Sequence, residues 1–370
     1  MTSVNVNGME LTRERVIEAL GPVREPVTGQ GLVEQRLVPE VAVEGRDVRL
    51  TIELISPTTA TKERLAHEVE TALRTIPELG QIAIDWRTRV RASSGGRTDA
   101  QPIQGVKNTI AVASGKGGVG KSTVAVNLAV ALARTGAKVG LLDADVYGPS
   151  VPLMMGQHGR PLMQQNKIVP LEAHGVTLMS IGFILDPGKA LIWRGPMVAQ
   201  LITQFLNDVQ WGNLDYLVID LPPGTGDVQL TLAQKIPISG AVIVTTPQEV
   251  ALADAVKGLR MFAEVKTPIL GIVENMSGFI CPNCAERHDI FGSGGGERTA
   301  AEHGVELLGK IPIEPGVRTG GDTGQPLVEA APDSATGIAF RALADRVADR
   351  LAADAMEKPR KPTIMLRTVR

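Results

Sequence analysis

Gly115-Lys116-Gly117-Gly118-Val119-Gly120-Lys121-Ser122 is the stretch that decides the fold. It follows the apolar run 108–113 and opens Lys121–Arg134, whose apolar residues recur at helical spacing. Glycines at these positions let successive backbone N–H groups approach an anion at a helix N-terminus. The pattern of Gly, four residues and Gly-Lys-Ser therefore predicts a phosphate-binding P-loop between a strand and a helix.

A dinucleotide fingerprint competes with this interpretation, because the same residues also spell G-x-G-x-x-G. In a P-loop, Lys121 reaches the β- and γ-phosphates, the Ser122 hydroxyl is a magnesium ligand, and Thr123 adds a hydroxyl near another phosphate. A dinucleotide site has no use for the Lys-Ser pair and leaves Asp220 unexplained. Asp220 ends the apolar run 216–219, where P-loop NTPases place the carboxylate that organises magnesium. The nucleoside-triphosphate interpretation is favoured.

A second lysine stands at the start of the loop, five residues before Lys121. A cation at Lys116 can point to a neighbouring subunit and neutralise charge in its phosphate site, as an arginine finger does in trans. The alternative is a solvated lysine. The functional interpretation implies a homodimer.

Two further carboxylates follow the apolar run 139–142. Asp143 and Asp145 share a face if the strand continues that far, and ligands of open α/β sheets bind at the carboxyl ends of strands. We expect Asp145 to orient the attacking water and Asp143 to lie nearer the metal. The segment 220–227, Asp-Leu-Pro-Pro-Gly-Thr-Gly-Asp, resembles a switch loop beside the γ-phosphate.

Beyond residue 105, apolar runs of strand length alternate with helical segments. Strands rich in Val, Ile and Leu that alternate with helices are typical of a mainly parallel sheet covered by helices on both faces, an α/β fold. We expect strands at 108–113, 139–142, 176–181, 216–219, 241–244, 269–273 and 307–311. Helices are expected at Lys121–Arg134, 197–209, 228–235, Glu249–Glu264, 295–303 and 334–356.

The composition predicts four segments along the chain. Residues 1–91 form a small α+β domain, with helical spacing at 11–20 and 61–76 and strand patterns at 41–54 and 81–86. This domain has no Cys and no phosphate loop, so we expect it to serve in docking or scaffolding. The other segments are a Gly- and Ser-rich flexible linker at 92–105, a P-loop ATPase domain at 106–356 and a basic tail at 357–370, expected to be disordered.

Composition also excludes several classes of protein. With 38 Lys and Arg against 40 Asp and Glu, the chain is not one that coats nucleic acid. Two cysteines in 370 residues exclude a disulfide framework. No apolar run is long enough to cross a bilayer, and residues 1–10 carry no secretory signal. We expect a cytoplasmic protein with neither a nucleic-acid nor a membrane partner.

Both cysteines lie in Cys281-Pro-Asn-Cys284, after an expected loop at 275–280. A thioredoxin-type pair would sit on a helix. A structural zinc site needs four ligands, and His288 supplies only a third. The remaining interpretation is a half-site, in which two subunits each give two thiolates to one iron–sulfur cluster. One two-fold axis can then serve both Lys116 and the cysteines.

The combination of motifs resembles the Mrp/ApbC family of iron–sulfur cluster carrier ATPases. The resemblance covers about residues 105–330, and 10–90 are similar to the small domain often fused in front of bacterial members. It implies a homodimer that hydrolyses ATP slowly with Mg²⁺ and passes a [4Fe–4S] cluster, held between two subunits by Cys281 and Cys284, from a scaffold to apo-protein clients. The motifs that carry it are 105–123, 141–152, 220–227, 274–284 and 290–292.

The same resemblance makes Lys116 the signature lysine of the deviant P-loop class that includes MinD, ParA and the nitrogenase iron protein. It also matches Asn275 to the residue that reads adenine in related ATPases, and it gives His288 no ligand role. The expected catalytic residues are Lys116, Lys121 and Asp145. The expected nucleotide-binding residues are Gly115, Lys116, Gly117, Gly118, Val119, Gly120, Lys121, Ser122, Thr123, Asp143, Asp220 and Asn275.

A MinD- or ParA-like ATPase that positions cargo on a membrane or on DNA is the alternative function. Such a protein can end in an amphipathic membrane helix, and 334–356 has an apolar face followed by a basic tail. Most such helices pack on their own domain. The cysteine pair favours the cluster carrier, because a positioning ATPase does not need it. A third option, an electron-transferring reductase component, shares the cluster but requires rapid redox turnover.

Overall fold

The computed structural model describes residues 11–77, 79–93, 101–184, 195–281, 283–284 and 286–357, which fall into two compact units divided after Val90. The expected tail from 358 onward and residues 94–100 of the expected linker lie outside the described residues. The described ends of that linker belong to the second unit. Ser93 N–H donates to Asn108 Oδ1 at 2.8 Å, and Ile103 is buried.

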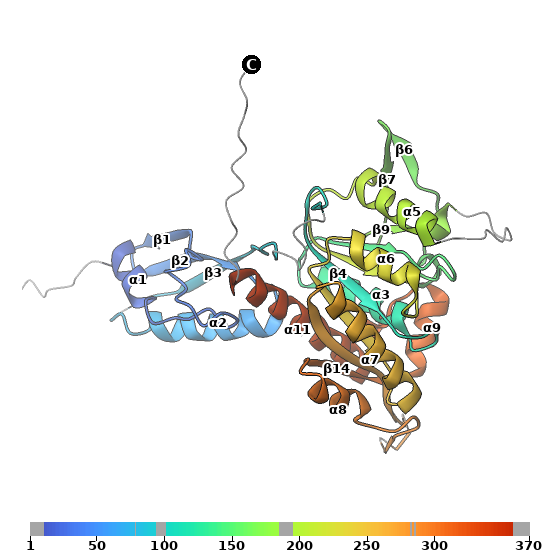
Figure 1. Cartoon of the computed structure of the whole chain (residues 1–370). Helices are drawn as coiled ribbons and strands as arrows, with labels where there is room; N and C mark the ends of the chain where they lie inside the picture. Colours follow the sequence, from blue (N-terminus) through green and yellow to red (C-terminus); the bar gives the residue numbers. More distant parts are fainter. Residues whose placement is uncertain are drawn as a thin grey trace, which may run out of the picture. The chain divides into compact units, whose positions relative to one another are not determined.

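The first unit, drawn in blue in Figure 1, is a three-stranded sheet with two helices. Strands β1 (Glu40–Glu44) and β2 (Asp47–Leu54) form a hairpin at Gly45, whose φ of 63° favours glycine. β3 (Ile82–Thr88) returns parallel to β2 after α2 (Thr59–Leu73), and α1 (Arg13–Ala19) precedes the hairpin. Alternate residues of β2 are buried together with Leu65 and Val69 of α2, which gives this unit a core of its own.

The second unit is built on a nine-stranded, mainly parallel sheet. The strand order is β13-β12-β11-β4-β10-β5-β9-β8, and β14 pairs with β12. Within this sheet, as far as its strands are described, only the β8–β9 and β12–β13 pairs are antiparallel. The strands are β4 (Val106–Ala113), β5 (Val139–Asp143), β8 (Leu171–Ala173), β9 (Val176–Ser180), β10 (Leu214–Asp220), β11 (Gly240–Thr245), β12 (Ile269–Ile280), β13 (Arg287–His288) and β14 (Leu307–Ile313).

The helices cover both faces of this sheet (Figure 1). From β4 to β5 the chain moves toward one edge of the sheet, and from β10 through β11 to β12 it moves toward the other edge. Because crossovers between parallel strands are right-handed, α3 lies on one face of the sheet, and α6 and α7 lie on the other. Helix α11 packs on α3, and α5 packs on α6. The helices are α3 (Lys121–Arg134), α4 (Val151–Met154), α5 (Gly195–Asp208), α6 (Asp227–Lys235), α7 (Glu249–Glu264), α8 (Gly295–Glu302), α9 (Pro315–Thr323), α10 (Leu327–Ala330) and α11 (Ala335–Glu357).

The expected α/β fold class is confirmed, and the seven expected strands coincide with β4, β5, β9, β10, β11, β12 and β14. The expected loop at 275–280 is wrong, because β12 continues to Ile280 and pairs with β13 there. Sequence analysis did not anticipate the hairpin of β6 (Leu162–Gln164) and β7 (Lys167–Val169). It also missed α9, although Pro315 at the first turn is a helix-start signal.

The first unit should be dispensable for nucleotide binding, because the P-loop and the carboxylates around it all lie in the second unit. We expect residues 91–370, produced alone, to bind Mg²⁺–ADP with the affinity of the full chain in isothermal titration calorimetry. A shortened chain that is folded by circular dichroism but has lost this affinity would contradict the division.

Candidate functional site

The P-loop connects β4 to α3 at the carboxyl edge of the sheet. Gly118 and Gly120 have φ of 81° and 82°, a region that other residues rarely adopt. A Cβ on Gly115 would lie 2.1 Å from the Asp254 carbonyl oxygen, and one on Gly120 would lie 2.2 Å from Asn275 Nδ2. No side chain caps the start of α3 at Gly120. The loop therefore brings backbone N–H groups to a helix N-terminus as an anion site requires.

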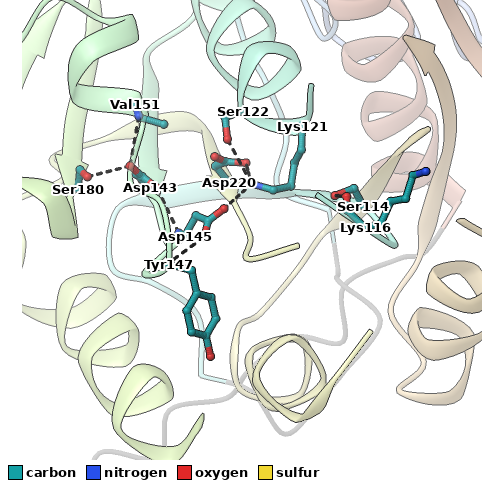
Figure 2. A network of polar contacts seen from close by, with 10 residues as sticks. All are labelled: Ser114, Lys116, Lys121, Ser122, Asp143, Asp145, Tyr147, Val151, Ser180 and Asp220. Carbon is teal, nitrogen blue, oxygen red and sulfur yellow. Dashed lines mark hydrogen bonds and ion pairs between the residues drawn. The ribbon is translucent and has the colours of Figure 1, made fainter. Parts of the chain in front are cut away.

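Lys121 sits at the centre of a buried charge cluster (Figure 2). Its Nζ lies 2.5 Å from Asp220 Oδ1 and 3.4 Å from Asp145 Oδ2. The Ser122 hydroxyl lies 3.3 Å from the same nitrogen. The structure thus brings together four of the residues that the sequence pattern singled out, and carboxylates surround the lysine where the pattern expects phosphates.

Asp143 and Asp220 end neighbouring strands in register, and both are fully buried. Burial raises the pKa of Asp143 to about 8, and repulsion from Asp220 adds to the effect. Burial also raises the pKa of Asp220, while Lys121 opposes the shift. Asp143 accepts hydrogen bonds from Ser180 Oγ at 2.8 Å and from the Asp145 N–H at 3.1 Å. The sequence did not indicate a role for Ser180, because this residue ends β9, in a different part of the chain from Asp143.

Asp220 Oδ2 is buried without a hydrogen-bond partner in the described part of the chain. A buried carboxylate oxygen without a donor is costly unless another group satisfies it. Mg²⁺ prefers oxygen ligands from carboxylates, hydroxyl groups and phosphates. The residues present therefore fit Mg²⁺, which Asp220 and Ser122 would hold.

Asp145 lies beyond the end of β5, so the condition under which it would share a strand face with Asp143 is not met. The strand stops at Asp143, and the Asp143 carboxylate caps the turn that follows it by accepting the Asp145 N–H. Asp145 nevertheless turns its carboxylate toward Lys121 and also accepts the Tyr147 N–H at 3.3 Å. Its role in orienting water stays a prediction.

Lys116 behaves differently from Lys121. Figure 2 shows its side chain directed away from the carboxylates, and the residue is only half-buried. The Ser114 hydroxyl donates to the Lys116 carbonyl at 2.9 Å, which fixes the backbone while leaving the ammonium group free of the central cluster. The expected action in trans stays a prediction.

A cavity of about 480 Å³ opens beside the P-loop at Gly120 and Thr123. Asn275 lines it, but its Nδ2 donates to the Val119 carbonyl at 2.8 Å, so this amide also holds the P-loop. Reading of adenine by Asn275 stays a prediction. Sequence analysis missed most of the other walls, which come from distant segments: Leu153, Met154, Met276, Phe291, Pro312, Ile313, Glu314, Val317, Arg318, Gly321 and Asp322.

The two cysteines lie in the turn of the hairpin formed by β12 and β13. The Cys281 N–H donates to the Glu286 carbonyl at 2.9 Å and closes this turn. Hydrogen bonds from the backbone N–H groups of Asn283 and Cys284 hold the pKa of Cys281 below its usual value. Cys284 is exposed. Two neighbouring thiols, one of them exposed and the other with a lowered pKa, are a candidate ligand set for a soft metal.

These features define a P-loop NTPase that carries a pair of cysteines in the turn between β12 and β13. A family model described as the NUBPL iron-transfer P-loop NTPase matches residues 105–348. A second, described as an iron-sulfur cluster assembly protein, matches residues 13–86. The chain belongs to this family of iron-transfer P-loop NTPases, which confirms the resemblance seen in the sequence.

Similar proteins cover nearly the whole chain. An iron-sulfur cluster carrier protein of Synechocystis is 47% identical over 352 residues, 94% of this chain and 99% of its own length. One from Escherichia coli K12 is 46% identical, over 92% and 93% of the two chains. An Arabidopsis thaliana protein named iron-sulfur protein required for NADH dehydrogenase, mitochondrial, is 54% identical over 69% and 82%.

Solved structures show the same fold for the second unit. A nucleotide-binding protein from Archaeoglobus fulgidus in complex with ADP has a TM-score of 0.55 and 44% identity, covering 60% of this chain and 89% of that one. Septum site-determining protein MinD from Pyrococcus horikoshii, complexed with Mg-ADP, has a TM-score of 0.50 and 25% identity, covering 65% of this chain and 95% of that one.

In the described residues, no helix is both long and apolar enough to span a bilayer.

The raised pKa of Asp143 predicts a pH dependence of stability. The pKa is about 8 in the folded protein against 3.8 in the unfolded chain, so the folded form keeps a proton that the unfolded chain releases. This stabilising contribution is complete below the unfolded value and is lost as pH rises through the folded one. We expect the melting temperature of nucleotide-free protein to fall from about pH 5 to about pH 8, and to fall less in Asp143→Asn.

The matched control is Asp333→Asn, since the Asp333 side chain is 92% exposed. Its melting temperature should follow the wild-type pH profile. An unchanged profile in Asp143→Asn would contradict the assignment.

Proposed function

We propose that this protein binds and hydrolyses Mg²⁺–ATP and carries a [4Fe–4S] cluster on Cys281 and Cys284 of two subunits, delivering it from a scaffold to apo-proteins. The observation that carries the proposal is the exposed cysteine turn at the end of β12, the strand that also supplies Asn275 to the P-loop. The names of the full-length relatives support the carrier role. These relatives are 47% and 46% identical to this chain, whereas MinD is 25% identical. MinD supports the alternative positioning function only because it has the same fold.

Nucleotide binding begins with an exchange of partners at Lys121. Its ammonium group neutralises Asp220 in this state, and triphosphate oxygens entering the P-loop would take over that role. The Asp220 carboxylate, with its unpartnered Oδ2, is then available beside the Ser122 hydroxyl. Mg²⁺ bound there would neutralise charge on the β- and γ-phosphates.

Hydrolysis needs a positioned water and charge compensation at the γ-phosphate. We assign the orientation of the water to Asp145, whose carboxylate lies 3.4 Å from Lys121 Nζ, and Asp143 would position Asp145 by accepting its N–H. Lys116 of one copy would reach the phosphates of the other, because its side chain leaves its own carboxylate cluster. The switch segment is tied to the P-loop by Gly224, whose N–H donates to the Ser114 carbonyl at 2.9 Å. Basal ATP hydrolysis should be slow, because a second copy of the chain is needed to complete the ATPase site.

Cluster binding follows from the thiolate count. One copy supplies two thiolates, and a [4Fe–4S] cube takes four, so two copies share one cluster. The N–H groups that lower the pKa of Cys281 also stabilise a metal-bound thiolate, as outer-shell donors do in other metal sites. We place the protein in the cytoplasm, with a scaffold and apo-protein clients as partners and with neither nucleic acid nor a membrane.

The two P-loop lysines should separate binding from catalysis. Lys121→Ala removes the cation at the phosphates and should abolish most ATP binding. Lys116→Ala should keep the affinity and lower kcat by about 10³-fold, the lower range for a cation acting in trans. Calorimetry and a phosphate-release assay measure the two effects. Equal loss of affinity in both variants would overturn the role of Lys116.

The cysteines should determine both iron content and assembly. Anaerobically reconstituted protein should hold about four irons per two chains, and Cys281→Ser or Cys284→Ser should abolish the cluster and weaken the dimer while ADP affinity is kept. His288→Ala is the control and should keep its iron, because His288 lies 3.8 Å from Glu286 and has no proposed ligand role. Iron and sulfide analysis with light-scattering mass is the measurement. A stable cluster on a monomer would refute the shared site.

A further inference from the structure

Both strands of the cysteine hairpin reach the wall of the nucleotide cavity. On the outgoing strand, Asn275 and Met276 of β12 line the cavity. On the returning side, Phe291 lines it as well. Cys281 and Cys284 lie between these two wall segments in the sequence. The cysteine turn is therefore connected to the cavity at both of its ends.

The outgoing strand is held firmly at the cavity. Glu274 is fully buried, and its carboxylate accepts the Ser277 hydroxyl and the Gly296 N–H, each at 2.5 Å. Met276 and Gly278 have positive φ, and the register against β14 shifts after Asn275, so a fixed bulge carries β12 out beyond the regular sheet. This strand has little freedom to respond to a ligand.

The returning strand is tied mainly to the hairpin itself. Phe279 pairs with His288, and the Ile290 N–H donates to the His288 carbonyl at 3.1 Å. The Gly292 N–H donates to the Asp289 carbonyl at 3.1 Å. Short local bonds thus run from Cys281 and Glu286 to the residues on either side of Phe291. Phe291 is 37% exposed and lines the cavity.

The chemistry of the wall around Phe291 suits a nucleoside base. Met276, Ile313 and Met154 add apolar surface, and Thr123 and Gly120 place this surface next to the phosphate loop. A flat base packs well on an aromatic ring, as nucleobases do on the aromatic side chains of other proteins. A nucleotide whose phosphates occupy the P-loop would bring its base against this wall.

We propose that Phe291 is a positioning residue shared by the two sites: a nucleoside packed against its ring fixes the returning strand, and bound nucleotide thereby changes the reactivity and the cluster affinity of Cys281 and Cys284. The proposal rests on the nucleotide site of the proposed function and adds the coupling to it. Coupling between two binding equilibria is reciprocal, so a cluster on the cysteines changes nucleotide affinity by the same factor.

Thiol alkylation of the full-length, cluster-free protein tests the coupling directly. The chain has only two cysteines, so iodoacetamide reports on the hairpin alone, and mass spectrometry separates the two sites. We expect saturating Mg²⁺–ADP to slow alkylation by about fivefold in the wild type, the lower range for coupled sites. In Phe291→Ala the effect should vanish although ADP still saturates the P-loop, and in Phe291→Leu part of it should return.

Ile290→Ala is the matched control. Ile290 is the adjacent apolar residue, 58% exposed, and it is absent from the described cavity wall, so this variant should keep the wild-type response. Cluster-loaded wild type should also differ from cluster-free protein in ADP affinity by about fivefold, and Phe291→Ala should not.

The possible outcomes distinguish a failure of the coupling from a failure of the proposed function. A wild type that binds ADP by calorimetry but shows no change in alkylation overturns the coupling and leaves the proposed function intact. A full response in Phe291→Ala overturns the role of Phe291. A wild type that does not bind ADP at all overturns the nucleotide site and the coupling together.

Discussion

The ion pair between Lys121 and Asp220 is the interaction on which the site depends. Removing two charges from water is costly, and a buried pair persists only where geometry and further partners compensate. Here three strands end at one edge, so that the P-loop supplies the lysine while β10 and β5 supply Asp220 and Asp143. The pair holds the P-loop lysine in place before any phosphate arrives. Because the site is buried, and because Asp220 lies close by, the same arrangement raises the pKa of Asp143.

Sequence reasoning predicted the parts of the site that are local in the chain. The P-loop follows from one eight-residue pattern, and Asp220 follows from an apolar run that ends in a carboxylate. Most of the cavity walls could not be predicted in this way, because Met154, Ile313 and Val317 come from segments far apart and lie in none of the motifs. Only the completed fold brings them together. Helix α9 was missed although Pro315 marks its start, since its short, Gly-rich sequence has no apolar periodicity.

The wrong prediction of a loop at 275–280 has a specific physical cause. Asn275, Ser277 and Gly278 are residues typical of turns, and Gly278 does adopt a positive φ. Pairing with β13 on one side and β14 on the other nevertheless keeps the segment extended, and Glu274 supplies the hydrogen bonds that the bulge needs. Tertiary pairing overrode local preference here, as it commonly does in strands. The result is a rigid outgoing strand in place of a flexible connection.

The lowered pKa of Cys281 also makes the cysteine turn vulnerable to oxygen. A thiolate reacts with oxidants far faster than a thiol, and its first product, a sulfenic acid, condenses with a nearby thiol to form a disulfide. Cys284 is the nearest such thiol in the sequence and is itself exposed. A chain oxidised in this way has no thiolate left for the proposed cluster until a reductant restores it. The hydrogen bonds that lower the pKa of Cys281 therefore also make the proposed cluster site dependent on reducing surroundings.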